Sequence, residues 1–192
     1  RLAAFLHDVG KPAAKIQRTI DGLVINNFYN HEFYSSEITK KLMTRMKFSN
    51  AEISYVTHLI QNHMFHYESN WTDSAVRRFI IKIGKENLND LIDLRLADMY
   101  GKYNQPVRLH DSQACNLLIE LKDRVSALLE QDNALSLKDL KINGNDLILL
   151  GAKGRQIGII LNDLFQTVID DPKMNTKEKL LEISKNLIEK IK

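Results

Sequence analysis

The sequence has few of the residues that cross-link chains or interrupt helices. It contains one cysteine, three prolines and eight glycines among 192 residues. A single cysteine excludes an internal disulfide and is typical of a reducing compartment, so we expect a cytoplasmic protein in which Cys115 is a buried, inert thiol. The scarcity of proline and glycine leaves long stretches of the chain free to form helices.

The sequence also lacks long apolar runs, a recognisable signal peptide and blocks of like charge. No run approaches the roughly 20 apolar residues of a membrane-spanning helix, so we expect no membrane partner. The 27 basic and 24 acidic residues give a formal charge of +3, which is too small to indicate nucleic-acid binding by itself. None of these features indicates an oligomeric state.

What remains is dominated by helical patterning. Hydrophobic residues make up 44% of the chain and recur mostly at the spacing of one helix face. This pattern predicts an all-α fold. Asp21-Gly22 before Leu23-Val24-Ile25 adds a turn followed by an extended segment. The expected helices cover residues 1–9, 31–46, 49–63, 72–83, 86–101, 111–130, 145–150, 155–170 and 176–191.

Local signals refine these boundaries. Ser49 followed by Glu52 has the spacing of a capping box, and Thr72 can cap the next helix. Asn143-Gly144 could form a hairpin turn, but the residues after it are better explained by a short capped helix ending at Gly151. The polar segment 131–142 indicates a domain boundary. We therefore divide the chain into a helical bundle over 1–131 and a small helical tail domain over 132–192.

The strongest chemical signal lies near the start of the chain, at His7-Asp8. An imidazole and a carboxylate from adjacent residues are both good ligands for a divalent cation. The apolar run 2–6 predicts that the pair follows a buried element. Because Gly10 and Pro12 should stop any helix, Lys11 is expected on a turn beside the pair, where it could hold a phosphate. An exposed lysine is the alternative.

Three further residues are candidate metal ligands at or within predicted helices. His31 begins one helix and His63 ends another. Asp98 lies within the apolar segment 94–99, where an unpaired carboxylate would be costly. The alternative for Asp98 is a salt bridge to a neighbouring arginine.

The order His7-Asp8, His31, His63, Asp98 resembles the HD superfamily of metal-dependent phosphohydrolases. This resemblance implies that the ligands come from separate helices of one bundle and hold a divalent ion such as Mg²⁺, Mn²⁺ or Ni²⁺. The family pattern also has a histidine upstream of the His-Asp pair, and this sequence begins at Arg1, too close to the pair to include it.

The resemblance also implies roles for these side chains. His7, Asp8 and Asp98 would hold the principal ion, and His31 and His63 would bind a second ion or contact the phosphate. The catalytic residues would be Asp8 and Lys11, with Lys11 stabilising developing negative charge.

Further motifs resemble the HD region and tail of bacterial tRNA nucleotidyltransferases, the CCA-adding enzymes and their poly(A) polymerase relatives. The sequence departs from that family at Asn30, where glycine is common, and in the loop 151–158, which lacks a frequent proline. The motifs lie at residues 5–12, 28–32, 48–50, 76–80, 95–98, 142–148, 150–151, 154–158 and 175–178.

The nucleotidyltransferase head of that family has a Gly-Ser turn followed by an Asp-x-Asp pair, and no such motif occurs here. We therefore expect this chain to be the C-terminal part of a longer protein, without polymerisation activity. The leading hypothesis is hydrolysis of phosphoesters on nucleotides or RNA ends. The alternatives are an architectural tRNA-binding module with a vestigial HD site and an HD nucleotidase unrelated to tRNA.

Two other basic positions could meet phosphate. Lys153 and Arg155 flank Gly154 before a helix, so two cations and backbone amides could bind tRNA there. A plain connection between helices is the alternative. Arg77 and Arg78 are adjacent on a helix and should not face the same partner; one of them could pair with an acidic group or a phosphate.

Overall fold

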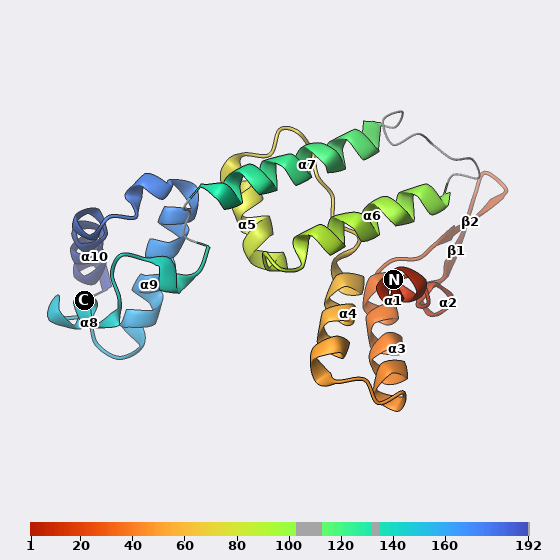
Figure 1. Ribbon diagram of the computed structural model, residues 1–192, viewed down its shortest axis with the longest axis horizontal. Coiled ribbons are helices and arrows are strands. Elements are labelled where there is room, and N and C mark those ends of the chain that lie inside the picture. Colours follow the sequence, from red (N-terminus) through yellow and green to blue (C-terminus); the bar gives the residue numbers. More distant parts are fainter. Residues whose placement is uncertain (103–112, 132–134, 192) are drawn as a thin grey trace. The chain divides into compact units, whose positions relative to one another are not determined.

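The computed structural model describes residues 1–102, 113–131 and 135–191, and confirms a fold that is mostly helical (Figure 1). The chain forms two compact units. The first unit consists of residues 1–68 and 83–122, and the second of residues 69–82 and 123–192. Among the described residues, no helix has both the length and the apolar character needed to cross a membrane.

The second unit includes a segment from the middle of the chain, which the sequence did not indicate. Residues 69–82, from the middle of the chain, belong to the second unit. The expected boundary after residue 131 falls next to residues 132–134, which lie outside the described part of the chain. The division into domains over 1–131 and 132–192 stays a prediction.

The first unit contains the N-terminal elements and the helix that carries Asp98. Its elements are α1 (Leu2–Leu6), α2 (Lys11–Ala14), β1 (Ile16–Ile20), β2 (Leu23–Asn27), α3 (His31–Arg45), α4 (Asn50–Asn62), α6 (Leu88–Lys102) and the start of α7 (Gln113–Glu130). In Figure 1, α3 and α4 pair side by side near the short helix α1.

The second unit contains α5 and the C-terminal helices around one apolar core. Its elements are α5 (Asp73–Ile83), the end of α7, the 3₁₀ turns η1 (Leu137–Asp139) and η2 (Pro172–Met174), α8 (Gly144–Leu149), α9 (Arg155–Asp170) and α10 (Lys177–Ile191). The fully buried side chains of Leu147, Ile160, Leu164 and Leu180 join α8, α9 and α10.

The capping signals read from the sequence are confirmed. The Ser49 hydroxyl accepts a hydrogen bond from the Glu52 amide, and the Glu52 carboxylate accepts one from the Ser49 amide, which closes a capping box at the start of α4. The Thr72 hydroxyl accepts a bond from the Ala75 amide ahead of α5. Asn143 caps α8, so the rejection of a hairpin there was correct.

Two of the predictions at helix ends, at Gly101 and Lys11, differ from the structure, and a third falls outside the described residues. Gly101 lies inside α6 rather than ending it. The expected helix start at residue 111 lies outside the described residues, and α7 is described from Gln113. Lys11 begins α2 rather than lying on a turn, because Pro12 occupies the first turn of that helix, where a missing amide hydrogen is tolerated. The predicted turn at Asp21-Gly22 is confirmed as the tip of the antiparallel hairpin β1–β2.

The two adjacent arginines of α5 both act on the end of α9. The buried Arg77 donates from Nη1 to the carbonyl oxygen of Ile169 at 3.0 Å. The half-exposed Arg78 pairs with the Asp170 carboxylate at 2.8 Å. The two arginines therefore bind different groups, as predicted, and Arg78 is the one that pairs with an acidic side chain.

Replacing Arg77 with methionine is expected to destabilise the protein by about 1–3 kcal/mol, because the buried Ile169 carbonyl loses its donor. Replacing Arg78 with methionine removes solvent-exposed contacts, the ion pair with Asp170 and a hydrogen bond to the Ser74 hydroxyl, and should cost less than about 1 kcal/mol. Urea unfolding measures the free energy of unfolding of both variants. Equal losses of stability would contradict the claim that the buried Arg77 contact stabilises the protein more than the exposed Arg78 contacts.

Candidate metal centre

All five predicted ligands belong to the first unit and come from four places in it. His7 is the C-cap of α1 and Asp8 follows it. His31 is the first residue of α3, and His63 is the C-cap of α4. Asp98 lies in α6.

Each of the three histidines is held by the same kind of hydrogen bond. The Nδ1 atom contacts the backbone carbonyl oxygen three residues earlier: Ala4 for His7 at 2.8 Å, Phe28 for His31 at 2.9 Å, and Ile60 for His63 at 2.6 Å. For His7 and His63, these carbonyls belong to the last turn of a helix. A carbonyl can only accept, so Nδ1 donates in all three rings, and Nε2 is the ring atom that can bind a cation.

The Nε2 atoms are turned into the protein rather than toward solvent. His63 is fully buried and His31 is 6% exposed. Within the described residues, the Nε2 atoms of both are buried without a hydrogen-bond partner. His31 Nε2 lies 3.3 Å from Asp8 Oδ1, but not in hydrogen-bonding geometry. Buried acceptors without donors are costly, and a cation bound between them would remove that cost.

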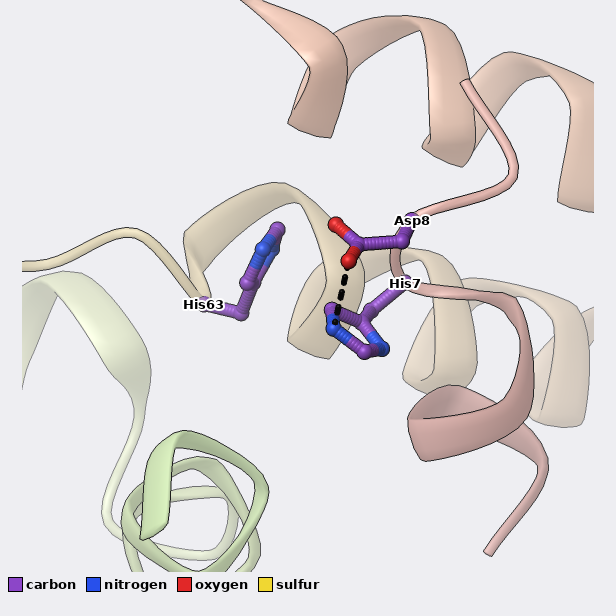
Figure 2. A group of neighbouring side chains, drawn as sticks. All are labelled: His7, Asp8 and His63. Atoms are coloured by element: carbon purple, nitrogen blue, oxygen red, sulfur yellow. Dashed lines mark ion pairs between the residues drawn. The ribbon is translucent and has the colours of Figure 1, made fainter. Parts of the chain in front are cut away.

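The ligand atoms of three residues converge most closely. His7, Asp8 and His63 each offer one atom, and these atoms lie within 4.8 Å of one another. Figure 2 shows these side chains turned toward one another, with His63 at the end of α4 and the other two on the turn after α1. The sequence analysis expected Asp98, rather than His63, to complete the principal site with His7 and Asp8.

Asp98 lies beside this group and contacts both His7 and Arg95. Its Oδ1 lies 3.4 Å from His7 Nε2, and its Oδ2 accepts a bond from Arg95 Nη1 at 3.0 Å. Its side chain is 5% exposed. The arginine pair weighed as an alternative for Asp98 is therefore present together with the contact to the histidine cluster.

His7 faces two carboxylates at once. Its Nε2 lies 3.3 Å from Asp8 Oδ2 and 3.4 Å from Asp98 Oδ1. A lone pair facing carboxylate oxygens at these distances is stabilised either by a proton on Nε2 or by a metal cation between the groups. The residues therefore fit a divalent ion. They offer imidazole and carboxylate donors, each imidazole directs Nε2 to the site, and the carboxylates supply negative charge.

The pKa values of the histidines move in opposite directions. The hydrogen bond to Asp98, helped by the charge of Asp8, raises the pKa of His7 despite partial burial. Burial, together with the neighbouring His7 and His31, lowers the pKa of His63. His63 is therefore held neutral, which is the form that binds metals.

Lys11 reaches back from the start of α2 to the same carboxylate. Its Nζ donates to Asp8 Oδ2 at 2.5 Å, and about a third of its side chain is exposed. It lines two pockets, each of about 500 Å³, which also share Asp8 and Asp98. This contact places a cation beside the cluster, where the sequence predicted one.

Two backbone features hold the cluster together and were only partly visible in the sequence. Asn30 has φ of 59°, the left-handed conformation that glycine adopts most readily, and asparagine tolerates it. This explains why the departure at Asn30 does not disturb the start of α3. Gly10 contacts the first turn of α3, and its amide donates to the buried Ser35 hydroxyl at 2.9 Å. The sequence indicated Gly10 only as a helix stop.

The sequence also missed the residues that line the larger pocket away from the cluster. Asn26, Asn27 and Tyr29 come from the end of β2 and the turn after it. The available signal was two aromatic residues among three asparagines immediately before His31. The predicted RNA-binding residues Lys153 and Arg155 belong to the second unit, where they are exposed and flank Gly154 at the start of α9.

Comparison with known proteins agrees with the resemblance to tRNA nucleotidyltransferases. Residues 31–184 match the family model described as "tRNA nucleotidyltransferase domain 2 putative". A 98-residue stretch is 34% identical to an A-adding tRNA nucleotidyltransferase of Deinococcus radiodurans, covering 51% of this chain and 21% of that protein. The match thus spans about a fifth of the curated relative's length. No solved structure matches the chain.

The family match covers most of the chain and includes α3, α4, α6 and the helices of the second unit. It begins at His31 and so does not include the His7-Asp8 turn. The chain belongs to the tRNA nucleotidyltransferase family represented by that domain model.

Proposed function

We propose that this chain is an HD-type, metal-dependent phosphohydrolase domain of a tRNA nucleotidyltransferase-like protein. Its substrates would be phosphoesters of nucleotides or of RNA ends. The observation that carries this proposal is the arrangement of three imidazoles. Each has Nδ1 bound to a backbone carbonyl, which leaves Nε2 as the ring atom that can bind a cation beside the Asp8 and Asp98 carboxylates.

His7, Asp8 and His63 would hold a divalent ion, with His31 and Asp98 beside them as further ligands or positioning groups. Such an ion lowers the pKa of water and neutralises phosphoryl oxygens. A site with both imidazole and carboxylate ligands suits Mn²⁺, Fe²⁺, Ni²⁺ or Zn²⁺ better than a site with oxygen ligands alone would.

The protein groups around the cluster have separate tasks in this proposal. Hydrogen bonds to the carbonyl oxygens of Ala4 and Ile60 orient the rings of His7 and His63. Lys11 Nζ, beside Asp8 and partly exposed to the pocket, would bind a phosphoryl oxygen and stabilise charge that develops on it. Arg95 neutralises the far oxygen of Asp98 and holds that carboxylate in place.

Hydrolysis of bis-p-nitrophenyl phosphate and of a nucleoside 2′,3′-cyclic phosphate, with Mg²⁺, Mn²⁺ or Ni²⁺ added, tests this function. Asp8→Asn keeps the size of the side chain but removes its charge, and should lower the rate about 100-fold. Asp93→Asn is the matched control, because Asp93 is exposed on α6 and pairs with Lys122. Equal rates in the wild-type protein and Asp8→Asn would contradict the proposal.

A specific observation favours an architectural, tRNA-binding module as the second candidate. Lys11 pairs with Asp8 and Arg95 pairs with Asp98, so both carboxylates of the cluster are partly neutralised by protein cations. In this case the helices would hold tRNA, with Lys153 and Arg155 as contacts. The absence of hydrolysis, with tRNA binding equal in the wild-type protein and Asp8→Asn, would support this candidate.

We infer that nucleotide addition, the activity named for the Deinococcus relative, would belong to another part of a longer protein. This sequence contains no Gly-Ser turn followed by an Asp-x-Asp pair. We likewise propose that tRNA is a substrate of the longer protein and that the protein is cytoplasmic.

A further inference from the structure

The β1–β2 hairpin and the turn after it form one side of the larger pocket at the histidine cluster. The cluster side of this pocket contains Asp8, Lys11, His31 and Asp98. The opposite side contains Asn26, Asn27, Phe28, Tyr29 and Asn30. A pocket of about 500 Å³ is within the range that binds small molecules.

Tyr29 provides an aromatic surface at this pocket. Tyr29 is 56% exposed, which is high for a tyrosine. The Arg18 guanidinium lies over the ring, 6.0 Å from its centroid, at the limit of cation–π distance. An exposed ring held in this way is suited to stack on a planar ligand.

Two asparagines at the end of β2 line the same pocket as Tyr29. In the described part of the chain, no hydrogen bond joins the side-chain amides of Asn26 or Asn27 to another protein group, and both residues line the pocket. An asparagine amide can donate and accept together, which is the pattern needed to bind the edge of a nucleobase. The hairpin thus supplies both a stacking surface and polar groups.

The charges divide the pocket into two ends. Asp8, Asp98 and Glu32 are acidic, and Lys11 is the cation on the cluster side. An anionic phosphate would bind beside these carboxylates only together with a cation, which the proposed metal supplies. The hairpin side carries no acidic side chain among the residues that line it.

We propose that Tyr29, with Asn26 and Asn27, forms a nucleobase-binding subsite, so that the ligand of this pocket is a nucleoside phosphate with its phosphate directed toward the histidine cluster. The inference rests on the proposed function for the placement of the phosphate. The base could belong to a free nucleotide or to the end of an RNA, since the recognised chemistry is the same.

Equilibrium binding tests this subsite without requiring catalysis. In the presence of Mn²⁺, the wild-type protein should bind AMP about tenfold more tightly than ribose 5-phosphate, because only AMP offers a base to stack. The Tyr29→Ala variant should reduce this ratio to about one. Tyr34→Ala is the matched control, because Tyr34 is also exposed but does not line the pocket.

Short RNAs with a 3′-phosphate, with and without the terminal base, distinguish the two sources of the ligand. A larger effect of the base in RNA than in AMP identifies an RNA end, and the reverse identifies a free nucleotide. A ratio near one in the wild-type protein, no binding of either probe, or an unchanged ratio in Tyr29→Ala would overturn the subsite. If the wild-type protein fails to hydrolyse phosphoesters but keeps the AMP preference, only the proposed function fails.

Discussion

Replacing Gly10 with alanine is expected to destabilise the protein by about 3 kcal/mol and to weaken metal binding at the cluster. A methyl group at this position would lie 2.3 Å from the Ser35 amide nitrogen and 2.7 Å from the His31 carbonyl oxygen. Both are backbone atoms of the first turn of α3, which cannot move aside as a flexible side chain can. Overpacking of this kind typically costs 1–3 kcal/mol, occasionally more.

The reason for the expected loss of metal binding is that Gly10 connects two groups of ligands. It lies two residues after Asp8, and it contacts the turn of α3 that begins with His31. Moving α3 away would separate His31 Nε2 from Asp8 Oδ1, now 3.3 Å apart. Because Gly10 has φ of −83°, alanine fits its backbone conformation, and the contact alone explains the effect.

Urea unfolding measures the change in stability, and Gly158→Ala is its control. Gly158 lies within α9, and a methyl group there would meet nothing within 4 Å. That variant should be more stable by about 0.5–1 kcal/mol, because alanine is the better helix former. If Gly10→Ala were as stable as the wild-type protein, the close contact with α3 would be contradicted.

Adding a divalent metal ion is expected to raise the thermal midpoint of the protein by about 5–10 °C. An ion that binds only the folded state at 100 times its dissociation constant stabilises that state by about 2.7 kcal/mol. For a chain of this length, each kcal/mol corresponds to a shift of about 2–4 °C. Thermal melts with Mn²⁺, Ni²⁺ or Zn²⁺, and again with a chelator, measure the effect.

The Asp98→Asn variant should lose most of this shift, because one of the two carboxylates facing His7 Nε2 would become neutral. Asp93→Asn, on the same helix but exposed, should keep it. Equal shifts in both variants would mean that the ion stabilises the protein from another site.

The helices and their caps could be predicted from the sequence because their signals are local. Ser49 and Glu52 form a capping box within four residues, and the apolar period of α4 continues to His63. Asp98 could be singled out from a local signal too, because a carboxylate in an apolar helix requires a compensating partner. The set of five candidate ligands followed from the resemblance to the HD superfamily.

The assembly of those ligands could not be predicted, because it depends on contacts between distant residues. Nothing near residue 63 indicates that a ligand atom of His63 should lie within 4.8 Å of those of His7 and Asp8. The close approach of Gly10 to Ser35 is likewise a long-range contact, and the sequence showed only a residue that ends helices. The hairpin was indicated by Asp21-Gly22, but its place beside the pocket was not.

Anomalous diffraction from crystals grown with Mn²⁺ tests the central claim most directly. We expect a single strong peak between His7 Nε2, His63 Nε2 and the Asp8 carboxylate, at coordination distances of roughly 2.0–2.3 Å. The peak should be absent from crystals of the Asp8→Asn variant. Absence of a peak among these residues in the wild-type protein, at an ion concentration that supports activity, would contradict a metal centre here.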